Sequence, residues 1–397
     1  MKNKICFVNC SANGSTGNIV KNLATFCSDT FDCCYILGDN LHGSDHVLSL
    51  SNTPLKYKLS RTQTFIFGND GFLHGSNKYK IRKFLEKEKP DLIHLHNVHR
   101  SFCNLEEVFN YSLKHNVKIV WTLHDEWILT GRCCCPQGCK KWIECCNRCE
   151  HKNYYPRAIF DRSLKFYQKK RTLLEKIGEN VTFVTPSKWL NEEVSCLGKS
   201  NLVINNGIDT NIFKPGSANP EIEQFAKNRF VVGGAALFFN DLKGGEIFKE
   251  LSNKLDPRKF LIVLIGSEKN QIERISDNLI ILPKTASLEE MASFYNSLNV
   301  FVNPTKTDNY PTTHLESISC GTPVITFNVG GATEMIKDKE AGFSVKYGDV
   351  DGIISKIEEI YTNQTLYSRE KVAEKSNFSK ENFCKEYKQL YLNLLKD

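Results

Sequence analysis

The sequence predicts an α/β protein with two Rossmann-like domains, and three observations support this. Its 397 residues, 41% of them hydrophobic, are enough to form two packed cores. Short apolar runs alternate with amphipathic runs along both halves, as expected of parallel strands joined by crossover helices. Residues 211–221 contain two prolines and a glycine, which break regular structure near the middle of the chain. We therefore expect domains at residues 1–210 and 211–378, followed by a helix within 379–397.

The first half should supply one parallel sheet. Apolar runs predict strands at residues 4–10, 33–37, 91–95, 117–123 and 181–185, and periodicity predicts helices at 18–26, 78–89, 161–176 and 186–197. Asn13 to Gly17 should form a loop after the first strand, where backbone can approach a phosphate or a sugar closely. A plain tight turn explains these glycines about as well. Residues 51–77 show no clear period and predict a long loop.

The second half should supply the other sheet. It predicts strands at residues 230–232, 261–265, 300–302 and 323–327, and helices at 288–298, near Pro311, at 350–362 and at 380–395. Gly342 and Phe343 predict a turn.

Charge and composition limit the class of protein. The formal net charge of +7 suits anionic ligands such as nucleotide sugars or a lipid-phosphate surface. No lysine and arginine run is interleaved with aromatic residues, which argues against nucleic acid. The run MKNKICFVNC is too short for the core of a signal peptide, and no window approaches the roughly 20 apolar residues that span a bilayer. We expect a cytoplasmic protein, which could also lie against the inner face of the cell membrane.

Residues 300–334, VFVNPTKTDNYPTTHLESISCGTPVITFNVGGATE, are the most informative stretch. They read as strand, loop, helix and strand, and such units bind ligands beyond the carboxyl ends of the strands, with anions on helix N-termini. Asp308 and Glu316 lie on either side of the predicted helix start. From the residues alone, Thr313 and Glu316 would form a capping box, and Pro311 suits a first helical turn.

The whole pattern is more specific than a helix start. An acid, seven residues, a second acid, then SCGTPVI and a glycine pair resembles the donor-sugar motif of family 4 of the retaining glycosyltransferases. That family has the GT-B fold, two facing Rossmann-like domains with a deep cleft between them. The resemblance implies that Asp308 contacts the donor hexose and that Glu316 accepts hydrogen bonds from the ribose. Most members have Glu where this chain has Asp308, and the DN-x-P variant is associated with exopolysaccharide and capsule enzymes. The other donor-binding residues that it implies here are Asn309, Tyr310, Pro311, Thr312 and Thr313, the last two through backbone amides that face the diphosphate.

Segments of the first half resemble the same family. Gly14 and Gly17 lie in a loop similar to the family's first loop, near the donor phosphate and the acceptor. His96 with Asn97 matches a recurrent pair. His124, which opens the phrase His-Asp-Glu-Trp after a strand, resembles the histidine that contacts the transferred sugar. Without the resemblance, His124 would more simply cap its strand.

Two further segments complete the resemblance. Asn206 opens the phrase NGID, which resembles the family's interdomain crossover and adds Asn206 to the donor-binding set. Lys243, followed by glycine, matches the second of two basic residues that hold the donor diphosphate. The first basic residue has no counterpart, because residues 235–240 read AALFFN. In this family the last helix, here within 379–397, commonly crosses back to the first domain.

Histidines and cysteines raise the question of a metal ion. His94 and His96 share one face of a strand, with His99 just beyond. They most simply form hydrogen bonds within the cleft, because no paired carboxylate accompanies them. Sixteen cysteines in a long chain without a predicted leader favour reduced or metal-bound thiols over disulfides.

Seven of these cysteines lie between residues 133 and 149. Related enzymes carry a reduced version of this insert, and that resemblance selects Cys133 or Cys135, Cys139, Cys146 and Cys149 as ligands of a structural zinc ion. Ordinary buried thiols and oxidation-prone surface thiols remain alternatives. A catalytic zinc is not expected here, because no histidine or water-activating carboxylate accompanies the cysteines.

The helix at 161–176 has an aromatic and leucine face and a cationic face. It could be an ordinary solvated helix, or Lys169, Lys170 and Arg171 could dock on anionic lipid.

The resemblance implies a retaining transfer from a UDP- or GDP-sugar to a glycan or lipid-linked acceptor in surface polysaccharide biosynthesis, with no cofactor required for catalysis. Two alternatives keep other classes open. A non-catalytic nucleotide-sugar or glycan binding protein would explain the missing basic residue. A cysteine-rich metal-binding protein would explain the insert.

Overall fold

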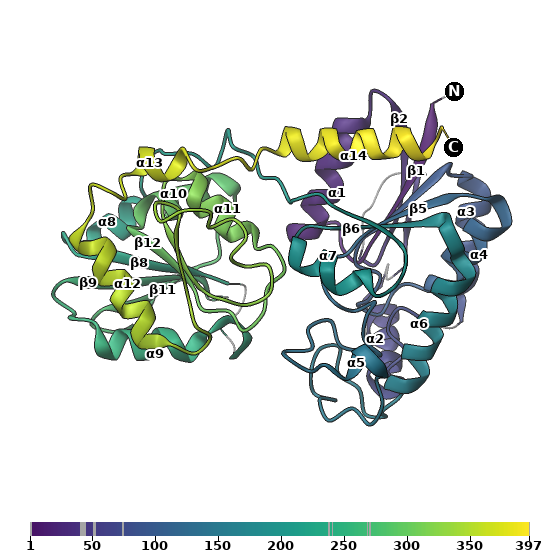
Figure 1. The fold of residues 1–397 in the computed structure, drawn as a ribbon, viewed down its shortest axis with the longest axis horizontal. Helices are drawn as coiled ribbons and strands as arrows, with labels where there is room; N and C mark the ends of the chain where they lie inside the picture. Colours follow the sequence, from purple (N-terminus) through teal and green to yellow (C-terminus); the bar gives the residue numbers. More distant parts are fainter. Residues whose placement is uncertain are drawn as a thin grey trace. The chain divides into compact units, whose positions relative to one another are not determined.

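The computed structural model describes residues 2–39, 45–50, 53–73, 75–236, 239, 241–267, 269 and 271–396. The chain divides into two compact units, which Figure 1 shows as two α/β bodies. Unit 1 consists of Met1–Asn205 with Phe383–Asp397, and unit 2 consists of Asn206–Asn382. The prediction of an α/β chain with two Rossmann-like sheets is confirmed.

Unit 1 is built on a parallel sheet in the order β3-β2-β1-β4-β5-β6-β7. Its strands are β1 (Asn3–Asn9), β2 (Phe31–Leu37), β3 (Val47–Ser49), β4 (Leu92–Leu95), β5 (Lys118–Thr122), β6 (Val181–Thr185) and β7 (Ser200–Val203). Its helices are α1 (Gly14–Cys27), α2 (Pro54–Phe67), α3 (Ser76–Glu88), α4 (Leu105–His115), α5 (Lys141–Glu144), α6 (Ser163–Ile177), α7 (Lys188–Ser195) and most of α14 (Lys380–Leu394).

Helices cover both faces of this sheet. Side chains alternate along a strand, so Ile5 and Phe7 of β1 pack with α1 and α14, whereas Cys6 and Val8 pack with α3 and α4. Figure 1 shows α14 in yellow beside α1 in purple. The apolar cores explain why β1, β4, β5 and β6 read as short continuous apolar runs in the sequence.

Unit 2 has a sheet in the order β10-β11-β9-β8-β12-β13-β14, parallel except for the β10 and β11 pair. Its strands are β8 (Phe230–Ala235), β9 (Phe260–Ser267), β10 (Glu273–Ser276), β11 (Leu279–Pro283), β12 (Val300–Asn303), β13 (Val324–Phe327) and β14 (Gly342–Val345). Its helices are α8 (Pro220–Ala226), α9 (Gly245–Lys254), α10 (Leu288–Ser297), α11 (Thr312–Ser319), α12 (Val350–Thr362) and α13 (Arg369–Ala373), with a short 3-10 turn η2 (Asp241–Lys243).

Each sheet has a point where the strand order reverses. In unit 1 the chain moves from β1 to β2 on one side and later to β4 on the other, and in unit 2 β8 stands between β9 and β12 in the same way. Ligands of such sheets bind beyond the carboxyl ends of the strands at this point. The segments after β1, β4, β8 and β12 are therefore where functional side chains should gather.

Three local predictions are wrong. Residues 54–67 form α2 rather than part of a long loop, because Thr53 caps the helix with its side chain, Pro54 occupies its first turn and Gly68 ends it at a φ of +60°. Residues 51, 52 and 74 of the predicted loop lie outside the described residues. Gly14 to Gly17 form the first turn of α1 rather than a loop. The predicted turn at Gly342 and Phe343 is the start of β14.

Within the described part of the chain, no helix combines the length and apolar composition needed to cross a membrane.

Candidate functional site

Two loops of unit 2 are fastened together at the carboxyl ends of β8 and β12. The backbone N–H of Lys306 donates to the carbonyl oxygen of Leu242, at 3.0 Å. Gly244 has a φ of +69°, and a Cβ there would lie 2.5 Å from the side chain of Pro304, so only glycine fits. Across this junction the Lys243 ammonium lies 2.9 Å from Oδ2 of Asp308. The structure thus brings together the residues predicted to hold the diphosphate and the hexose.

The start of α11 is held by a buried histidine. Asn303 donates its Nδ2–H to Nε2 of His314 at 2.8 Å, and Nδ1 of His314 donates to the carbonyl oxygen of Ala332 at 3.0 Å. Burial lowers the pKa of His314 to about 4, so the ring is neutral at pH 7 and can both accept and donate. These bonds fix α11 between β12 and the loop after β13.

The capping-box interpretation of Thr313 and Glu316 is wrong. The N-cap of α11 is Pro311, and no side chain caps the helix. Thr312 and Thr313, both half-buried, form the first turn, whose N–H groups have no partner within the helix. The glutamate carboxylate is therefore not used to close the helix end.

Glu316 instead faces a tyrosine from α10. Tyr295, which is fully buried, donates its hydroxyl to Oε2 of Glu316 at 2.9 Å. Burial raises the pKa of Glu316 to about 7, although hydrogen bonds from Tyr295 and Thr312 oppose the rise. A half-buried carboxylate whose partners among the described residues are hydroxyl groups can accept further hydroxyls from a ligand.

The rest of the predicted donor-binding set shapes the loop before α11. Asn206 donates its Nδ2–H to the carbonyl oxygen of Tyr310 at 3.3 Å. The backbone N–H of Gly331 donates to the carbonyl oxygen of Asp308 at 3.1 Å. The backbone N–H of Asn309 donates to Oδ1 of Asp308 at 3.0 Å. Asn309 and Tyr310 are buried. Asn206, Asn309 and Tyr310 therefore set the course of this loop, and Asp308 projects from it.

In unit 1 the predicted histidines divide into two environments. His94 is fully buried in the core, where Nε2 lies 2.8 Å from the Thr122 hydroxyl and Nδ1 lies 2.7 Å from the Tyr391 hydroxyl. The expectation that His94 forms hydrogen bonds within a cleft is wrong, because its partners are core residues. His96, which shares a strand face with it, lies with its ring centroid 4.1 Å from that of His94.

His96 links this core histidine to the predicted sugar contact. Its Nδ1 lies 3.0 Å from Nε2 of His124, and the two rings stack with centroids 5.3 Å apart. Burial lowers the pKa of His124 to about 4, so this half-buried ring is uncharged at pH 7. An uncharged imidazole here can form hydrogen bonds with sugar hydroxyls but adds no positive charge.

The two glycines predicted near the donor phosphate have different structural roles. Gly14 opens α1 with a φ of +76°, and nothing lies within 4 Å of where a Cβ would be. Gly17 packs against the preceding turn, since a Cβ there would lie 2.5 Å from the carbonyl carbon of Ala12. Gly14 therefore borders open space, whereas Gly17 is required for packing.

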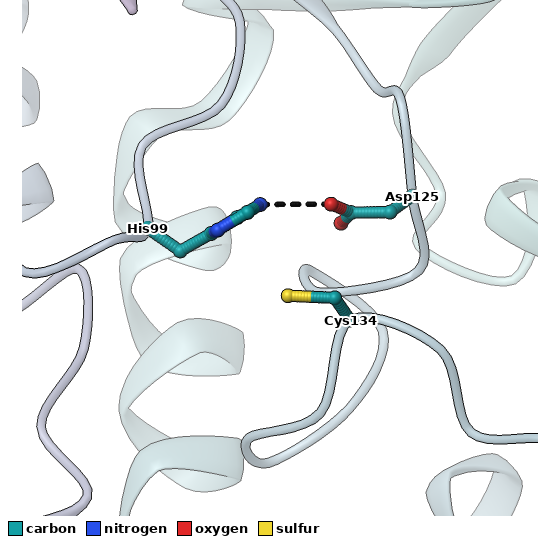
Figure 2. A group of neighbouring side chains, drawn as sticks. All are labelled: His99, Asp125 and Cys134. Atoms are coloured by element: carbon teal, nitrogen blue, oxygen red, sulfur yellow. Dashed lines mark hydrogen bonds and ion pairs between the residues drawn. The ribbon is translucent and has the colours of Figure 1, made fainter. Parts of the chain in front are cut away.

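A second polar group lies beside the histidines. His99 Nε2 is 2.8 Å from Oδ2 of Asp125, and Figure 2 shows the Cys134 thiol beside this pair. Burial alone lowers the pKa of His99, but the Asp125 carboxylate outweighs it and the pKa is raised. Among the described residues, His99, Asp125 and Cys134 are the only three whose ligand atoms lie within 4.8 Å of one another. They could hold a metal ion, although burial raises the pKa of the Cys134 thiol well above its usual range.

The four cysteines selected for zinc line one cavity of about 30 Å³, namely Cys133, Cys139, Cys146 and Cys149. None of the sixteen cysteines, all within the described residues, is in a disulfide. Four thiols around a small cavity are the donor set that a structural zinc ion takes. Among these four described cysteines, no three sulfur atoms all lie within 4.8 Å of one another, so a bound ion would have to draw them inward.

The lipid-docking hypothesis for α6 is wrong at its central residue. Lys170 is 1% exposed, donates to the carbonyl oxygens of Trp127 and Thr130, and lies 3.4 Å from the centre of the Trp127 ring. Burial lowers its pKa to about 7. Lys169 is paired with Glu106 at 2.8 Å. A lysine at this position supports the fold of unit 1 and cannot face a lipid.

Several site residues could not be found from the sequence. Tyr295 sits in an apolar helix face, and nothing in its neighbourhood signals that it supports Glu316. His99 and Asp125 are 26 positions apart, and only the adjacency of β4 and β5 makes them a pair. A sequence signal did exist for Asn303, a polar residue at a strand end, where α/β sheets place functional groups.

Two family models match the chain. The model described as glycosyl transferases group 1 matches residues 235–363, and the model described as glycosyltransferase family 4 matches residues 46–212. The chain is 26% identical over 315 residues to the Escherichia coli (strain K12) glycosyl transferase WcaC, which is named for colanic acid biosynthesis. The match covers 76% of this chain and 75% of that relative.

Other similarities are partial or confined to the fold. CapM of Staphylococcus aureus, a capsular polysaccharide biosynthesis glycosyltransferase, is 30% identical over 184 residues, 43% of this chain and 48% of that relative. The structure of Anabaena HepE in complex with UDP is similar with a TM-score of 0.67 at 16% identity, over 98% of this chain and 100% of that one. At that identity the likeness shows the GT-B fold.

Proposed function

We propose, because this chain belongs to the group 1, family 4 glycosyltransferases, that it transfers a sugar from a nucleotide diphosphate donor to a hydroxyl of a glycan or a lipid-linked oligosaccharide in surface polysaccharide biosynthesis. Membership of a nucleotide-sugar-dependent family removes the cysteine-rich metal protein as a reading of the whole chain. The acceptor class is supported by the names of WcaC and CapM, which belong to colanic acid and capsule biosynthesis.

The observation that carries the proposal is the free accepting capacity of Glu316 beside the start of α11. In the proposal its carboxylate accepts the ribose hydroxyls, the N–H groups of Thr312 and Thr313 meet the diphosphate, and the Lys243 ammonium neutralises charge that develops on the leaving diphosphate. Asp308 is assigned to the hexose and its ion pair with Lys243 holds both groups at one junction. UDP is the first nucleotide to test, since HepE binds it.

In unit 1, His124 is assigned to the transferred sugar. Its neutral ring, fixed by stacking on His96, can orient a hydroxyl without adding charge. Rate enhancement in this proposal comes from positioning and from stabilisation of the departing diphosphate, so no separate catalytic base is assigned.

A thermal-shift series with UDP, GDP, ADP and their sugars tests the donor site. A ligand that binds only the folded state stabilises it by about 2.7 kcal/mol at a concentration 100 times its Kd. We expect one nucleotide to raise the melting temperature of the wild type and to lose this effect in Glu316→Ala. Glu289→Ala, an exposed carboxylate on α10, is the matched control and should respond like the wild type. A shift that survives Glu316→Ala would contradict the assignment, and hydrolysis of the donor separates an enzyme from a binder.

A further inference from the structure

A cavity of unit 1 has a volume of about 570 Å³ and is lined by α2, Asp70, the turn after β4 and residues 155–157, which follow the cysteine-rich insert. Six of the residues that line it carry the argument, namely Tyr57, Arg61, Asp70, Arg100, Tyr155 and Arg157. We propose that this cavity binds the diphosphate of a lipid-linked acceptor. The inference rests on the proposed function and gives it an acceptor class and a place.

The cavity holds three guanidinium groups without a carboxylate partner among the described residues. Arg61 lies over the Tyr57 ring at 5.5 Å, Arg157 donates its Nε–H to a carbonyl oxygen at 3.2 Å, and Nη1 of Arg100 lies 4.0 Å from a cysteine sulfur. These contacts leave most of the donors of each fork available. Arginine forks bind phosphate oxygens in pairs, so three of them around one cavity fit a diphosphate.

Among the described residues that line the cavity, the one acid is Asp70, whose carboxylate already accepts hydrogen bonds from the backbone. Its carboxylate oxygens accept from the N–H of Ser101 at 2.7 Å, of Gly71 at 3.0 Å and of Arg100 at 3.1 Å. Asp70 therefore positions the turn after β4 and leaves the charge of the arginines largely uncompensated.

That turn has an unusual backbone. Arg100 and Ser101 have φ values of +74° and +63°, the left-handed region that side chains other than glycine rarely adopt. Such conformations persist where surrounding bonds enforce them, and they concentrate at functional sites. Here the hydrogen bonds that Arg100 and Ser101 donate to the Asp70 carboxylate enforce them, and the Arg100 side chain lines the cavity.

Helix α2 supplies an apolar border that suits a lipid. Tyr57, Arg61 and Phe65 line the cavity at positions four apart, one face of the helix. Of these, Tyr57 and Phe65 are 40% and 47% exposed, and the helix contains no acidic residue. Exposed apolar side chains next to arginines that have no carboxylate partner among the described residues complement a prenyl diphosphate better than an acidic sugar, which has no apolar part of that size.

The cavity adjoins the histidines of the proposed site within the same unit. The ring of Tyr155 lies 6.0 Å from that of His99, and Arg100 follows His99 directly. A sugar attached to a diphosphate in this cavity would therefore lie beside the carboxyl ends of β4 and β5, where His124 is placed.

Calorimetric titration of the full chain with farnesyl diphosphate tests the proposal. The protein carries Lys243→Ala in every arm, so that the proposed donor site does not contribute. We expect Arg61→Ala combined with Arg157→Ala to weaken binding by about a hundredfold, roughly tenfold for each lost charge-assisted contact. Arg100 is left intact because its backbone is strained. Lys58→Ala with Arg162→Ala, which remove the same charge outside the cavity lining, should change the affinity less than threefold.

Other ligands decide the source of the anion. Equal affinity for inorganic pyrophosphate would assign the cavity to a soluble phosphate, and binding of glucuronate in place of farnesyl diphosphate would assign it to an acidic sugar; either result overturns the lipid assignment. An affinity for farnesyl diphosphate that the double arginine variant leaves unchanged overturns the site itself. Nucleotide thermal shifts are also measured on Arg61→Ala with Arg157→Ala in a chain that keeps Lys243. This measurement tests the donor site by itself, so failure of this inference stays separate from failure of the donor site.

Discussion

Burial raises the pKa of the Glu316 carboxyl to about 7, against an ordinary value of 4.5. A ribose hydroxyl donates more strongly to the ionised form, so nucleotide affinity should depend on this proton. We expect the Kd of the preferred nucleotide to be constant above about pH 8 and to rise by up to tenfold per pH unit below 7. Titration calorimetry between pH 5.5 and pH 8.5, in buffers that bracket this pKa, measures the dependence.

Glu316→Gln supplies the control, because it keeps the size of the side chain and removes the titration. Its affinity should be weaker at pH 8 and flat with pH, and a wild-type profile that is equally flat would contradict the role of Glu316. The free energy of unfolding should depend on pH in the opposite sense to the nucleotide affinity. Since the folded pKa exceeds the unfolded one, the stability that Glu316 contributes is present below pH 4.5 and is lost as the pH rises through about 7.

Lys170 makes a second prediction at the scale of a residue. Lys170→Glu would place a carboxylate against the carbonyl oxygens of Trp127 and Thr130, and an uncompensated buried charge costs about 3–5 kcal/mol. Arg171→Glu on the same helix should cost less than about 1 kcal/mol, because its side chain stacks on Tyr167 and forms one long hydrogen bond of 3.4 Å to the hydroxyl of that residue. Urea denaturation of both variants compares them, and equal losses would contradict the buried position of Lys170.

The ionisation of Lys170 gives this prediction a pH signature. Its folded pKa of about 7 lies below the ordinary value of 10.5, so above pH 7 the unfolded chain binds more protons than the folded one. The wild type should therefore gain stability over Lys170→Met as the pH rises from 7 to 9, by up to about 1.4 kcal/mol per pH unit. Parallel denaturation curves at the two pH values test the sign.

At the scale of elements, the sequence predicts the helices that bury an apolar stripe. It does not predict α2, which buries no such stripe. The helix expected at 78–89 is α3, which buries Ile81, Phe84 and Leu85. Among the side chains of α2 whose burial the structure describes, only Thr64 is buried, so the helix has no apolar period to detect. Its caps were visible, a threonine, a proline and a closing glycine, and they specify a helix without any help from periodicity.

The cysteine-rich insert allows two competing metal sites to be separated. We expect purified protein to contain about one zinc ion per chain and to lose it in Cys146→Ser with Cys149→Ser, because these thiols line the small cavity. Elemental analysis by mass spectrometry measures the content. Cys134→Ser should keep the metal, whereas loss in that variant alone would place the ion on the His99 and Asp125 group.

Cys196→Ser, an exposed thiol at the end of α7, controls for the loss of a cysteine as such. A chelator should lower the melting temperature of the wild type but not that of the Cys146 and Cys149 variant, since metal binding contributes directly to folding. Protein without metal in every arm would show that the four thiols are ordinary buried cysteines.

At the scale of the whole molecule, the order of strands and helices could be predicted and the partners of the site could not. Local apolar runs mark β1, β5, β6 and β12, since each is buried on both faces. The short strand β14 opens with Gly342, which hides it as a turn. The pairs His99 with Asp125 and Tyr295 with Glu316 arise from the adjacency of elements, which no single-sequence pattern records.

The C-terminal helix gives a prediction about unit 1 as a whole. From Phe383 onward α14 belongs to unit 1, and its Tyr391 hydroxyl lies 2.7 Å from Nδ1 of the core residue His94. Tyr391→Phe leaves that buried nitrogen without its partner and should destabilise unit 1 by about 1–3 kcal/mol. All four tryptophans, at positions 121, 127, 142 and 189, lie in unit 1. Tryptophan fluorescence in urea therefore reports the unfolding of unit 1 alone.

Lys385→Ala, an exposed side chain on the same helix, should leave the fluorescence midpoint unchanged. Ending the chain after residue 379 should do more than Tyr391→Phe, because it also removes Phe383, Cys384 and Tyr387 from the core of unit 1. The nucleotide-induced thermal shift, which is assigned to unit 2, should survive the point substitution. A fluorescence midpoint that Tyr391→Phe and the truncation both leave in place would mean that α14 contributes nothing to the stability of unit 1, despite its buried tyrosines.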